Sequence, residues 1–260
     1  MKIFVAVDME GISGIFQSQQ VIPGSGLYEE GRRFLTQDVN ACVEGCFAGG
    51  ADKVVVRDIH GGGNHFIWAD LDPRAEYVRG STDRERLPDI AKCHGLILLG
   101  YHAMAGTPEA ILEHTMSSKS WQHCWLNGKI TGETGIDAGI AGDHGVPTIL
   151  VTGDDKVCRE AKQLLKGVVT AQVKVGLSCQ GGQLLSRKAS YDLIVKRATE
   201  AVRSAPKIKP FKVKAPVKMR IELVSRGRVP STDSKPYAKI IDGRTYEVTA
   251  DTVEQALRRL

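Results

Sequence analysis

The chain has no apolar run that approaches the length of a membrane span, about 20 residues. Its first apolar run, residues 3–7, ends at Asp8 and is too short for the apolar core of a secretory signal. Its six cysteines show no CxxC spacing, and a disulfide scaffold is not expected in a chain of 260 residues. We therefore expect a protein of the reducing cytoplasm that has no membrane partner.

Aromatic residues make up only 6% of the chain, and they do not interleave with basic residues in a nucleic-acid-binding pattern. The net charge of +5 arises mostly in residues 207–218, where lysines alternate with apolar residues as on a solvated linker and strand face. We therefore expect no nucleic-acid partner. The 42% hydrophobic and 25% charged residues are ordinary for a globular protein of one large or two smaller domains.

Four apolar runs, residues 3–7, 53–57, 95–101 and 147–153, show no alternation of polar and apolar residues. Such runs are typical of parallel strands that helices cover on both faces. Amphipathic or small-residue segments alternate with them and predict helices. The fold class that this order predicts is α/β, with a mainly parallel sheet flanked by helices and a smaller C-terminal α+β lobe.

The alternation of strands and helices breaks near residue 205, in a segment with two prolines and two lysines. We therefore expect an α/β metal-binding catalytic domain over residues 1–204 and a smaller α+β lobe over residues 205–260. The predicted helices are residues 28–48, 133–141, 156–167, 185–204 and a last one from Thr252. A hairpin is expected at residues 121–130, with Asn127-Gly128 as its turn. Further strands are expected near residues 75–79, 217–224 and 239–248.

Each of the four apolar runs ends in a side chain that can bind a metal: Asp8-Met9-Glu10, Asp58-Ile59-His60, His102 and Asp154-Asp155. Because the carboxyl ends of parallel strands share one edge of a sheet, these side chains are expected to meet there. Residues i and i+2 of an extended chain point to the same side, so Asp8 and Glu10 can converge on one cation. An isolated Asp-x-Glu would more often cap the next segment.

The other histidines have weaker placements. His65, His94, His123 and His144 follow no apolar strand, and we expect them to be surface or structural residues. His114 follows a short segment that must run close to the His102 strand end. The glycines at 61–63 match neither the dinucleotide fingerprint nor the Walker pattern, and they favour a loop that passes close to a bound metal or substrate.

Several of these motifs occur in the order and at the spacing of a known family. They are Val7-Asp8-Met9-Glu10-Gly11-Ile12-Ser13-Gly14, Asp58-Ile59-His60, Gly100-Tyr101-His102-Ala103, Thr107-Pro108 with His114-Thr115-Met116, Asn127-Gly128 with Gly132-Glu133-Thr134-Gly135, and Val151-Thr152-Gly153-Asp154-Asp155. Over roughly the first 160 residues the chain resembles the D-aminopeptidase family of the dipeptide-transport type. The C-terminal third resembles that family only loosely.

The resemblance implies an aminopeptidase with two zinc ions per subunit, held by Asp8, Glu10, His60, His102 and Glu133. It also implies a catalytic role for His114, short peptide substrates that contain D-amino acids, and a ring-based homo-oligomer of decameric size. Oxygen and nitrogen ligands of this kind suit zinc if one carboxylate bridges the two ions, and Asp8 is the natural bridge. Two metals could activate a water for attack on the first peptide bond.

The resemblance implies that His114 could be a nucleophile. A role as general acid/base, or in stabilising the oxyanion, fits better beside a metal-activated water. Asp58 and Asp154 are expected either to accept the free ring N–H of a metal-bound histidine or to cap strand ends. Two rival functions stay open: a magnesium-dependent phosphohydrolase of the haloacid-dehalogenase kind, and a non-catalytic metal-binding shell protein. The histidines argue against magnesium, which prefers oxygen ligands.

Overall fold

The computed structural model describes residues 1–82, 85–231 and 233–260. One sheet contains β1 (Lys2–Val7), β2 (Lys53–Asp58), β3 (Glu76–Val78), β4 (Gly95–Leu99), β7 (Thr148–Asp154), β8 (Val169–Ser178) and β9 (Gly181–Leu184); the other contains β5 (Trp121–Leu126), β6 (Lys129–Thr131), β10 (Val217–Leu223), β11 (Lys239–Ile240) and β12 (Thr245–Ala250). The helices are α1 (Tyr28–Ala48), α2 (Glu133–Asp143), α3 (Asp155–Leu164), α4 (Arg187–Ser204) and α5 (Val253–Arg259), with short 3₁₀ turns η1 (Ser18–Gln20), η2 (Trp68–Asp70), η3 (Ile90–Lys92) and η4 (Ala205–Lys207).

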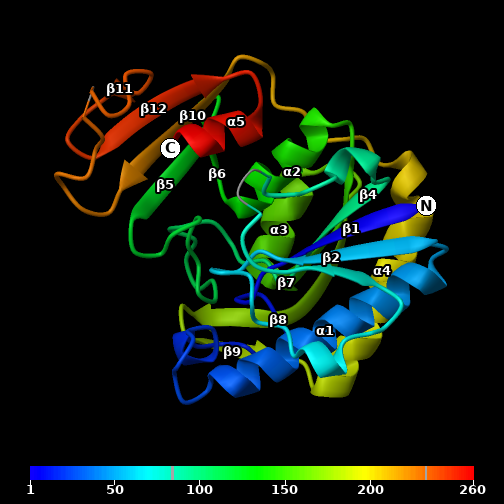
Figure 1. The fold of residues 1–260 in the computed structure, drawn as a ribbon. Coiled ribbons are helices and arrows are strands. Elements are labelled where there is room, and N and C mark those ends of the chain that lie inside the picture. Colours follow the sequence, from blue (N-terminus) through cyan, green and yellow to red (C-terminus); the bar gives the residue numbers. More distant parts are fainter. Residues whose placement is uncertain (83–84, 232) are drawn as a thin grey trace.

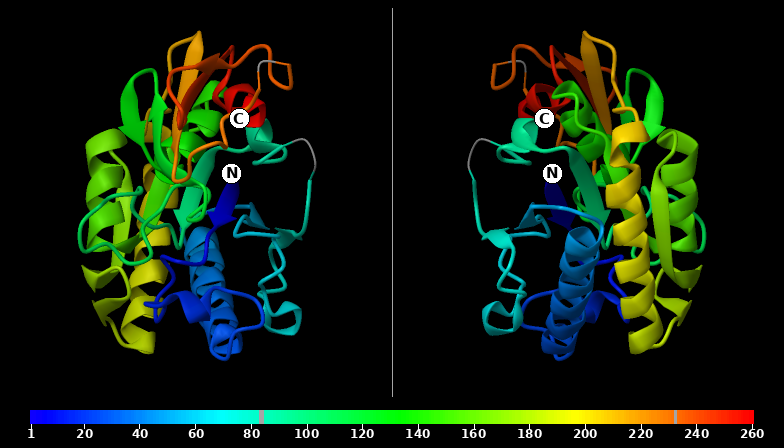
Figure 2. Two further views of the ribbon diagram at one scale, coloured as in Figure 1. Left: turned by 90° about the vertical axis from the view of Figure 1, so that its left-hand side faces the viewer. Right: turned by 90° about the vertical axis from the view of Figure 1, so that its right-hand side faces the viewer.

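The first sheet has the strand order β3-β2-β1-β4-β7-β8-β9, and every neighbouring pair is parallel except β8 and β9. Helices α1 and α4 cover one face, while α2 and α3 lie on the other face, between this sheet and the second one (Figures 1 and 2). Strand β1 alternates between the two cores: Ile3 and Val5 pack with α1 and α4, whereas Phe4 and Ala6 pack toward α2 and α3. The uninterrupted apolar runs in the sequence therefore reflect burial on both faces.

The order of strands reverses between β1 and β4. From β1 the chain builds outward through β2 and β3, and from β4 it builds the other way through β7 and β8. A crevice opens outside the carboxyl ends of two strands at such a switch point, because the connections leave them in opposite directions. Asp8 follows β1 and His102 lies just beyond β4, so both belong to this crevice.

Glycines allow the two strand ends at this switch point to approach each other. The N–H of Gly11 donates to the carbonyl oxygen of Gly100 at 2.7 Å. A Cβ at Gly11 would lie 1.9 Å from the carbonyl oxygen of Tyr101, and Gly100 has a φ of +72° with no room for a Cβ beside the Asp8 carbonyl. Gly11 is therefore required by close packing of backbone, whereas the left-handed φ explains Gly100.

Most of the elements predicted from the sequence are confirmed within a few residues, including the hairpin at Asn127-Gly128, where both residues have positive φ. The α/β class with a mainly parallel sheet is also confirmed. Strands β8 and β9 were missed, although Val169, Ala171, Val173 and Val175 recur at every second position before β9. That period of two was the available signal.

The division into residues 1–204 and 205–260 stays a prediction, and the second sheet as observed does not follow it. Strand β10 pairs with β5 as well as with β12, so two of the five strands in this sheet come from residues 121–131. Hydrogen bonds between β5 and β10 join the C-terminal segment to the middle of the chain. The second sheet is therefore built from two separate stretches of sequence.

Replacing Gly11 with alanine is expected to lower the free energy of unfolding by about 3 kcal/mol, because the added methyl group would overlap the Tyr101 carbonyl oxygen. Urea denaturation followed by circular dichroism measures this change. Gly26→Ala is the matched control, since a Cβ at Gly26 meets nothing within 4 Å. Equal stability of the two variants would contradict the close approach of the strand ends.

Candidate metal centre

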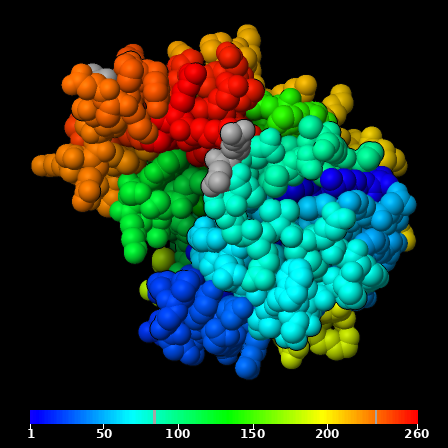
Figure 3. Space-filling view, in the orientation of Figure 1, coloured from blue at the N-terminus to red at the C-terminus, as the bar shows by residue number. Residues whose placement is uncertain are grey.

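The five side chains expected to bind metal lie together at the carboxyl edge of the first sheet. Asp8 and Glu10 come from the end of β1, His60 follows β2, His102 follows β4, and Glu133 is the first residue of α2. Among the described residues, groups of three or more histidine, cysteine or carboxylate side chains close enough to share an ion occur in two places: Asp8, Glu10 and His60 form one group, and His102, Glu133 and the neighbouring His114 form the other. Figure 3 shows the segments after β1 (blue) and β2 (cyan) side by side on one face.

Asp8 faces a histidine with each of its carboxylate oxygens. Its Oδ1 lies 3.1 Å from His60 Nδ1, and its Oδ2 lies 3.2 Å from His102 Nε2. Glu10 Oε2 lies 3.0 Å from the same nitrogen of His60, and Glu133 Oε1 lies 3.3 Å from His102 Nε2. The cluster thus has two halves, each with one histidine and one glutamate, and the Asp8 carboxylate stands between them.

Backbone carbonyls determine which ring nitrogen of each histidine faces the carboxylates. His60 Nε2 lies 3.0 Å from the carbonyl oxygen of Val21, and His102 Nδ1 lies 3.0 Å from that of Ala103. A carbonyl oxygen only accepts, so these ring nitrogens carry the N–H. The other nitrogen of each ring therefore faces carboxylate oxygens with its lone pair, unless a proton or a metal ion lies between them.

This arrangement fits a bound cation. Glu10 Oε2 and His102 Nε2 are buried and form no hydrogen bond with correct geometry, despite their short distances to polar atoms. Burial disfavours the charged imidazolium, yet the facing carboxylates outweigh it and raise the pKa of His60 and His102 well above the ordinary value. Burial likewise opposes ionisation of Asp8, but the two histidines lower its pKa. A positive charge is therefore favoured among these atoms.

His114 lies against the second half of the cluster. Its ring stacks on the ring of His102 with a centroid separation of 4.0 Å and an interplanar angle of 11°. Its Nδ1 donates to the carbonyl oxygen of Leu112, so Nε2 is directed toward Glu133 Oε1 at 3.8 Å. This distance is too long for a hydrogen bond, but it lies within the span of two side chains that share one ion.

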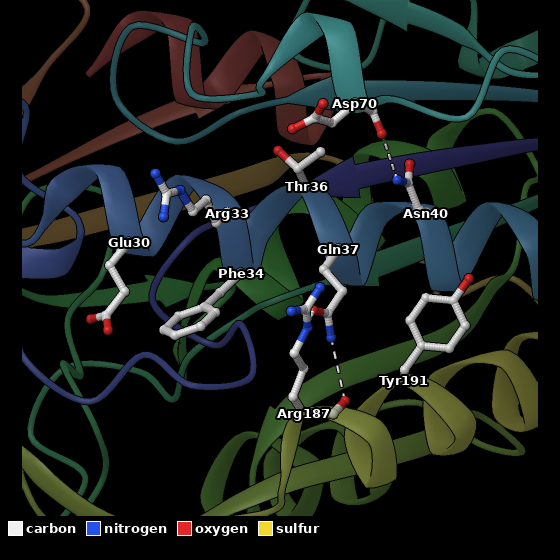
Figure 4. Close-up of a pocket in the computed structure, with 9 residues that line it drawn as sticks. All are labelled: Glu30, Arg33, Phe34, Thr36, Gln37, Asn40, Asp70, Arg187 and Tyr191. Carbon is white, nitrogen blue, oxygen red and sulfur yellow. Dashed lines mark hydrogen bonds between the residues drawn. The ribbon is translucent and has the colours of Figure 1, made fainter.

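A cavity of about 640 Å³ opens over the cluster, and Asp8, Glu10, His60, His114 and Glu133 are part of its wall. A second cavity of about 630 Å³ lies between α1, α4 and Asp70 (Figure 4). Polar groups of that second cavity bond to one another, as the amides of Gln37 and Asn40 do with the carbonyl oxygens of Arg187 and Asp70. The chemistry-bearing side chains are therefore concentrated at the first cavity.

Comparison with known proteins shows the family of this chain. A family model described as D-aminopeptidase matches residues 1–260. The chain belongs to the D-aminopeptidase family. A D-aminopeptidase of Bacillus subtilis (strain 168) is 32% identical over 249 residues, which are 94% of this chain and 89% of that protein. The solved structure of the zinc-dependent D-aminopeptidase DppA from Bacillus subtilis, a self-compartmentalizing protease, has a TM-score of 0.95 at 30% identity and covers 100% of this chain and 95% of its own.

Membership of the D-aminopeptidase family confirms the expected fold and the expected class of function, a metallo-aminopeptidase. The phosphohydrolase and the non-catalytic shell protein are not favoured. No helix among the described residues is long and apolar enough to cross a membrane.

Asp58 and Asp154 were each expected either to bind the ring of a metal-bound histidine or to cap a strand end. In this D-aminopeptidase homologue neither contacts the ring of His60 or His102. Asp58 accepts the backbone N–H of His65 at 2.7 Å and lies 3.0 Å from the His65 ring nitrogen, so it holds His65 and not the ring of His60. His65 is buried as expected of a structural residue and packs edge-on against His60. Asp154 caps α3 and accepts the N–H of Ile111, which is the capping alternative.

Sequence reasoning missed the network behind Glu133. The side chain of Arg86 donates to Glu133 at 3.3 Å and to Asp137, and Asp137 also accepts the Tyr101 hydroxyl at 2.6 Å. The N–H of Met116 donates to Glu133 Oε1 at 2.7 Å. Burial opposes ionisation of Glu133, but His102 and Arg86 lower its pKa, so this carboxylate is held in its charged form.

Lys174 of β8 was missed as well. Its fully buried ammonium donates to the carbonyl oxygens of Glu10, Ile12 and Ile15 at 2.7, 2.9 and 2.6 Å. Burial lowers the pKa of Lys174 to about 8, and nearby carboxylates oppose that shift, so the amine stays protonated at neutral pH. Asp38 of α1 adds two hydrogen bonds to Ser13. These contacts fix the loop that carries Glu10.

Lys174→Met is expected to lower the free energy of unfolding by about 3 kcal/mol, because three buried carbonyl oxygens would lose their donor. The variant should also retain less zinc after dialysis, because the loop that presents Glu10 would be free to move. Urea denaturation and elemental analysis measure the two effects. Lys188→Met, at an exposed lysine on α4, is the control. If Lys174→Met were as stable as the control, the hydrogen bonds from Lys174 to the three carbonyl oxygens would not stabilise the protein.

Proposed function

We propose that this protein is a zinc-dependent aminopeptidase that removes the first residue from short peptides containing D-amino acids. The observation that carries the proposal is the Asp8 carboxylate, whose two oxygens face His60 and His102 at 3.1 and 3.2 Å. A carboxylate with a histidine on each side suits a bridge between two metal ions. The zinc dependence of the Bacillus subtilis enzyme supports zinc as the metal, and we propose two ions per subunit.

In this proposal Glu10 and His60 complete the ligand set on one side of Asp8, and His102 and Glu133 complete it on the other. Bound zinc would act as a Lewis acid and lower the pKa of an attacking water toward neutrality. The protein holds these ligands in place through the carbonyls of Val21 and Ala103, which orient the two imidazoles. An acidic pocket of this kind also attracts the free amino group of a peptide, which would make the enzyme exo-acting.

We propose that His114 acts as a general acid/base or stabilises the oxyanion, and not as the nucleophile. Its Nδ1–H is bound to the Leu112 carbonyl, so Nε2 is the nitrogen available to a substrate. That nitrogen borders the cavity beside Glu133, where it can donate a proton to a developing negative charge or exchange one with the leaving amine. His114 stacks on His102, and this contact limits the orientations its ring can take.

A homo-oligomer, decameric by family resemblance, belongs to the same proposal. The Bacillus subtilis neighbour is described as self-compartmentalizing, which supports an assembly that encloses its active sites. We also propose a cytoplasmic location. All six cysteines, which lie within the described residues, are free thiols, as is usual in a reducing compartment.

Zinc-loaded protein is expected to release D-alanine from D-alanyl peptides, and His114→Ala is expected to lower kcat by about 100-fold or more while keeping its zinc. The physical reason is that His114 contacts the cavity through Nε2 but has only a long contact with Glu133. Chromatographic detection of free D-alanine gives the rate, and elemental analysis gives the zinc content.

The control is His144→Ala, which changes an exposed histidine at the end of α2 and should leave the rate unchanged. Removal of zinc with a chelator should abolish release of D-alanine, and added zinc should restore it. An active chelated protein would contradict the metal requirement. Loss of zinc from His114→Ala would make His114 a ligand, and full activity of that variant would remove it from the mechanism.

A further inference from the structure

Arg57, the fifth residue of β2, is a buried cation whose side chain forms no hydrogen bond or ion pair with the residues that the structure describes. Only 9% of its surface is exposed, and its Nε and Nη1 atoms are buried without a hydrogen bond. Burial lowers the pKa of Arg57, and the nearby guanidinium of Arg86 adds to that effect. A guanidinium that is removed from water in this way normally pairs with an anion, because the uncompensated charge is costly.

The carboxylates around Arg57 are already bound to other donors. Asp58 accepts from His65, and Asp137 accepts from Arg86 and Tyr101. Glu254 accepts the backbone N–H of Arg86 and forms an ion pair with Arg258. The charge of Arg57 therefore lacks a dedicated counter-ion among the described residues.

Arg57 lines a cavity of about 390 Å³ that is separate from the metal cavity but adjoins it. Glycines at 61–63 and Gly80 form part of the wall, and a Cβ at Gly62 or Gly80 would meet nothing within 4 Å. The two cavities share Ile59, Gly61 and Arg86 as lining residues. A molecule with one end at the metal centre can therefore have its other end close to the Arg57 cavity.

We propose that this cavity is a carboxylate-binding subsite, in which Arg57 receives the terminal carboxylate of a short peptide whose amino end lies at the metal centre. The inference rests on the proposed aminopeptidase function and deepens it, because it makes free peptide acids the preferred substrates. The one guanidinium of this wall that lacks a carboxylate partner among the described residues matches one negative charge. The Asp58, Glu85 and Glu254 carboxylates in the same wall would repel a multiply charged anion such as a phosphate more strongly than a single carboxylate.

The test compares D-alanyl dipeptides and tripeptides as free acids with the same peptides as C-terminal amides, using zinc-loaded protein. Wild type is expected to favour the acid in kcat/KM by about tenfold at one or both lengths, mainly through KM, because a charge-assisted hydrogen bond is lost in the amide. Arg57→Met should remove this preference and leave hydrolysis of the amide near the wild-type rate. Arg57→Lys, which keeps the charge, should retain most of the preference.

Arg197→Met is the matched control, because it removes a positive charge from a residue on α4 that is paired with Glu200 and lines neither cavity. Its preference for the acid should equal that of wild type. Equal rates for acid and amide in wild type, or a preference that persists in Arg57→Met, would overturn the subsite and leave the aminopeptidase function intact. If Arg57→Met cleaved neither acids nor amides, the Arg57→Lys variant would decide. An active Arg57→Lys protein that cleaves acid and amide equally well would overturn the subsite. Failure of wild type to cleave any of the peptides would contradict the proposed function itself.

Discussion

Three buried carboxylates, those of Asp8, Glu10 and Glu133, share one crevice with two histidines whose N–H groups point away from them. Negative charges packed this closely repel one another strongly in a medium of low dielectric constant. A cation, or protons in its place, must therefore lie among them. The rest of the site is arranged around this requirement, and the Asp8 carboxylate is its centre because it faces both histidines.

Fixed positive side chains of the fold, together with the strand ends, hold these closely packed carboxylates in place. Arg86 neutralises Glu133 from behind, and Lys174 holds the loop that carries Glu10 through three carbonyl oxygens. Gly11 lets this loop lie against the end of β4, which brings Asp8 within reach of His102. The contacts of Arg86 and Lys174, together with Gly11, thus hold the proposed ligands at short distances. A site prepared in this way limits the reorganisation needed to bind a metal.

Much of this site could be predicted from the sequence because it depends on local rules. An apolar run that ends in Asp8-Met9-Glu10 or before His102 indicates a strand whose carboxyl end bears ligands, and parallel pairing brings such ends together. Arg86 and Lys174 could not be predicted, because neither stands in a motif and each acts on residues far away in the chain. Asp58 follows an apolar run as the proposed ligands do, yet its carboxylate faces His65. The side of the strand on which a carboxylate lies depends on packing, which short motifs do not encode.

The claim on which the interpretation depends is that Asp8 bridges two cations. Anomalous diffraction from crystals of the zinc-loaded protein, recorded on both sides of the zinc absorption edge, tests it most directly. We expect two peaks per subunit, one between Asp8, Glu10 and His60 and the other between Asp8, His102 and Glu133. A single peak that does not contact Asp8, or zinc bound elsewhere on the chain, would contradict a dinuclear centre.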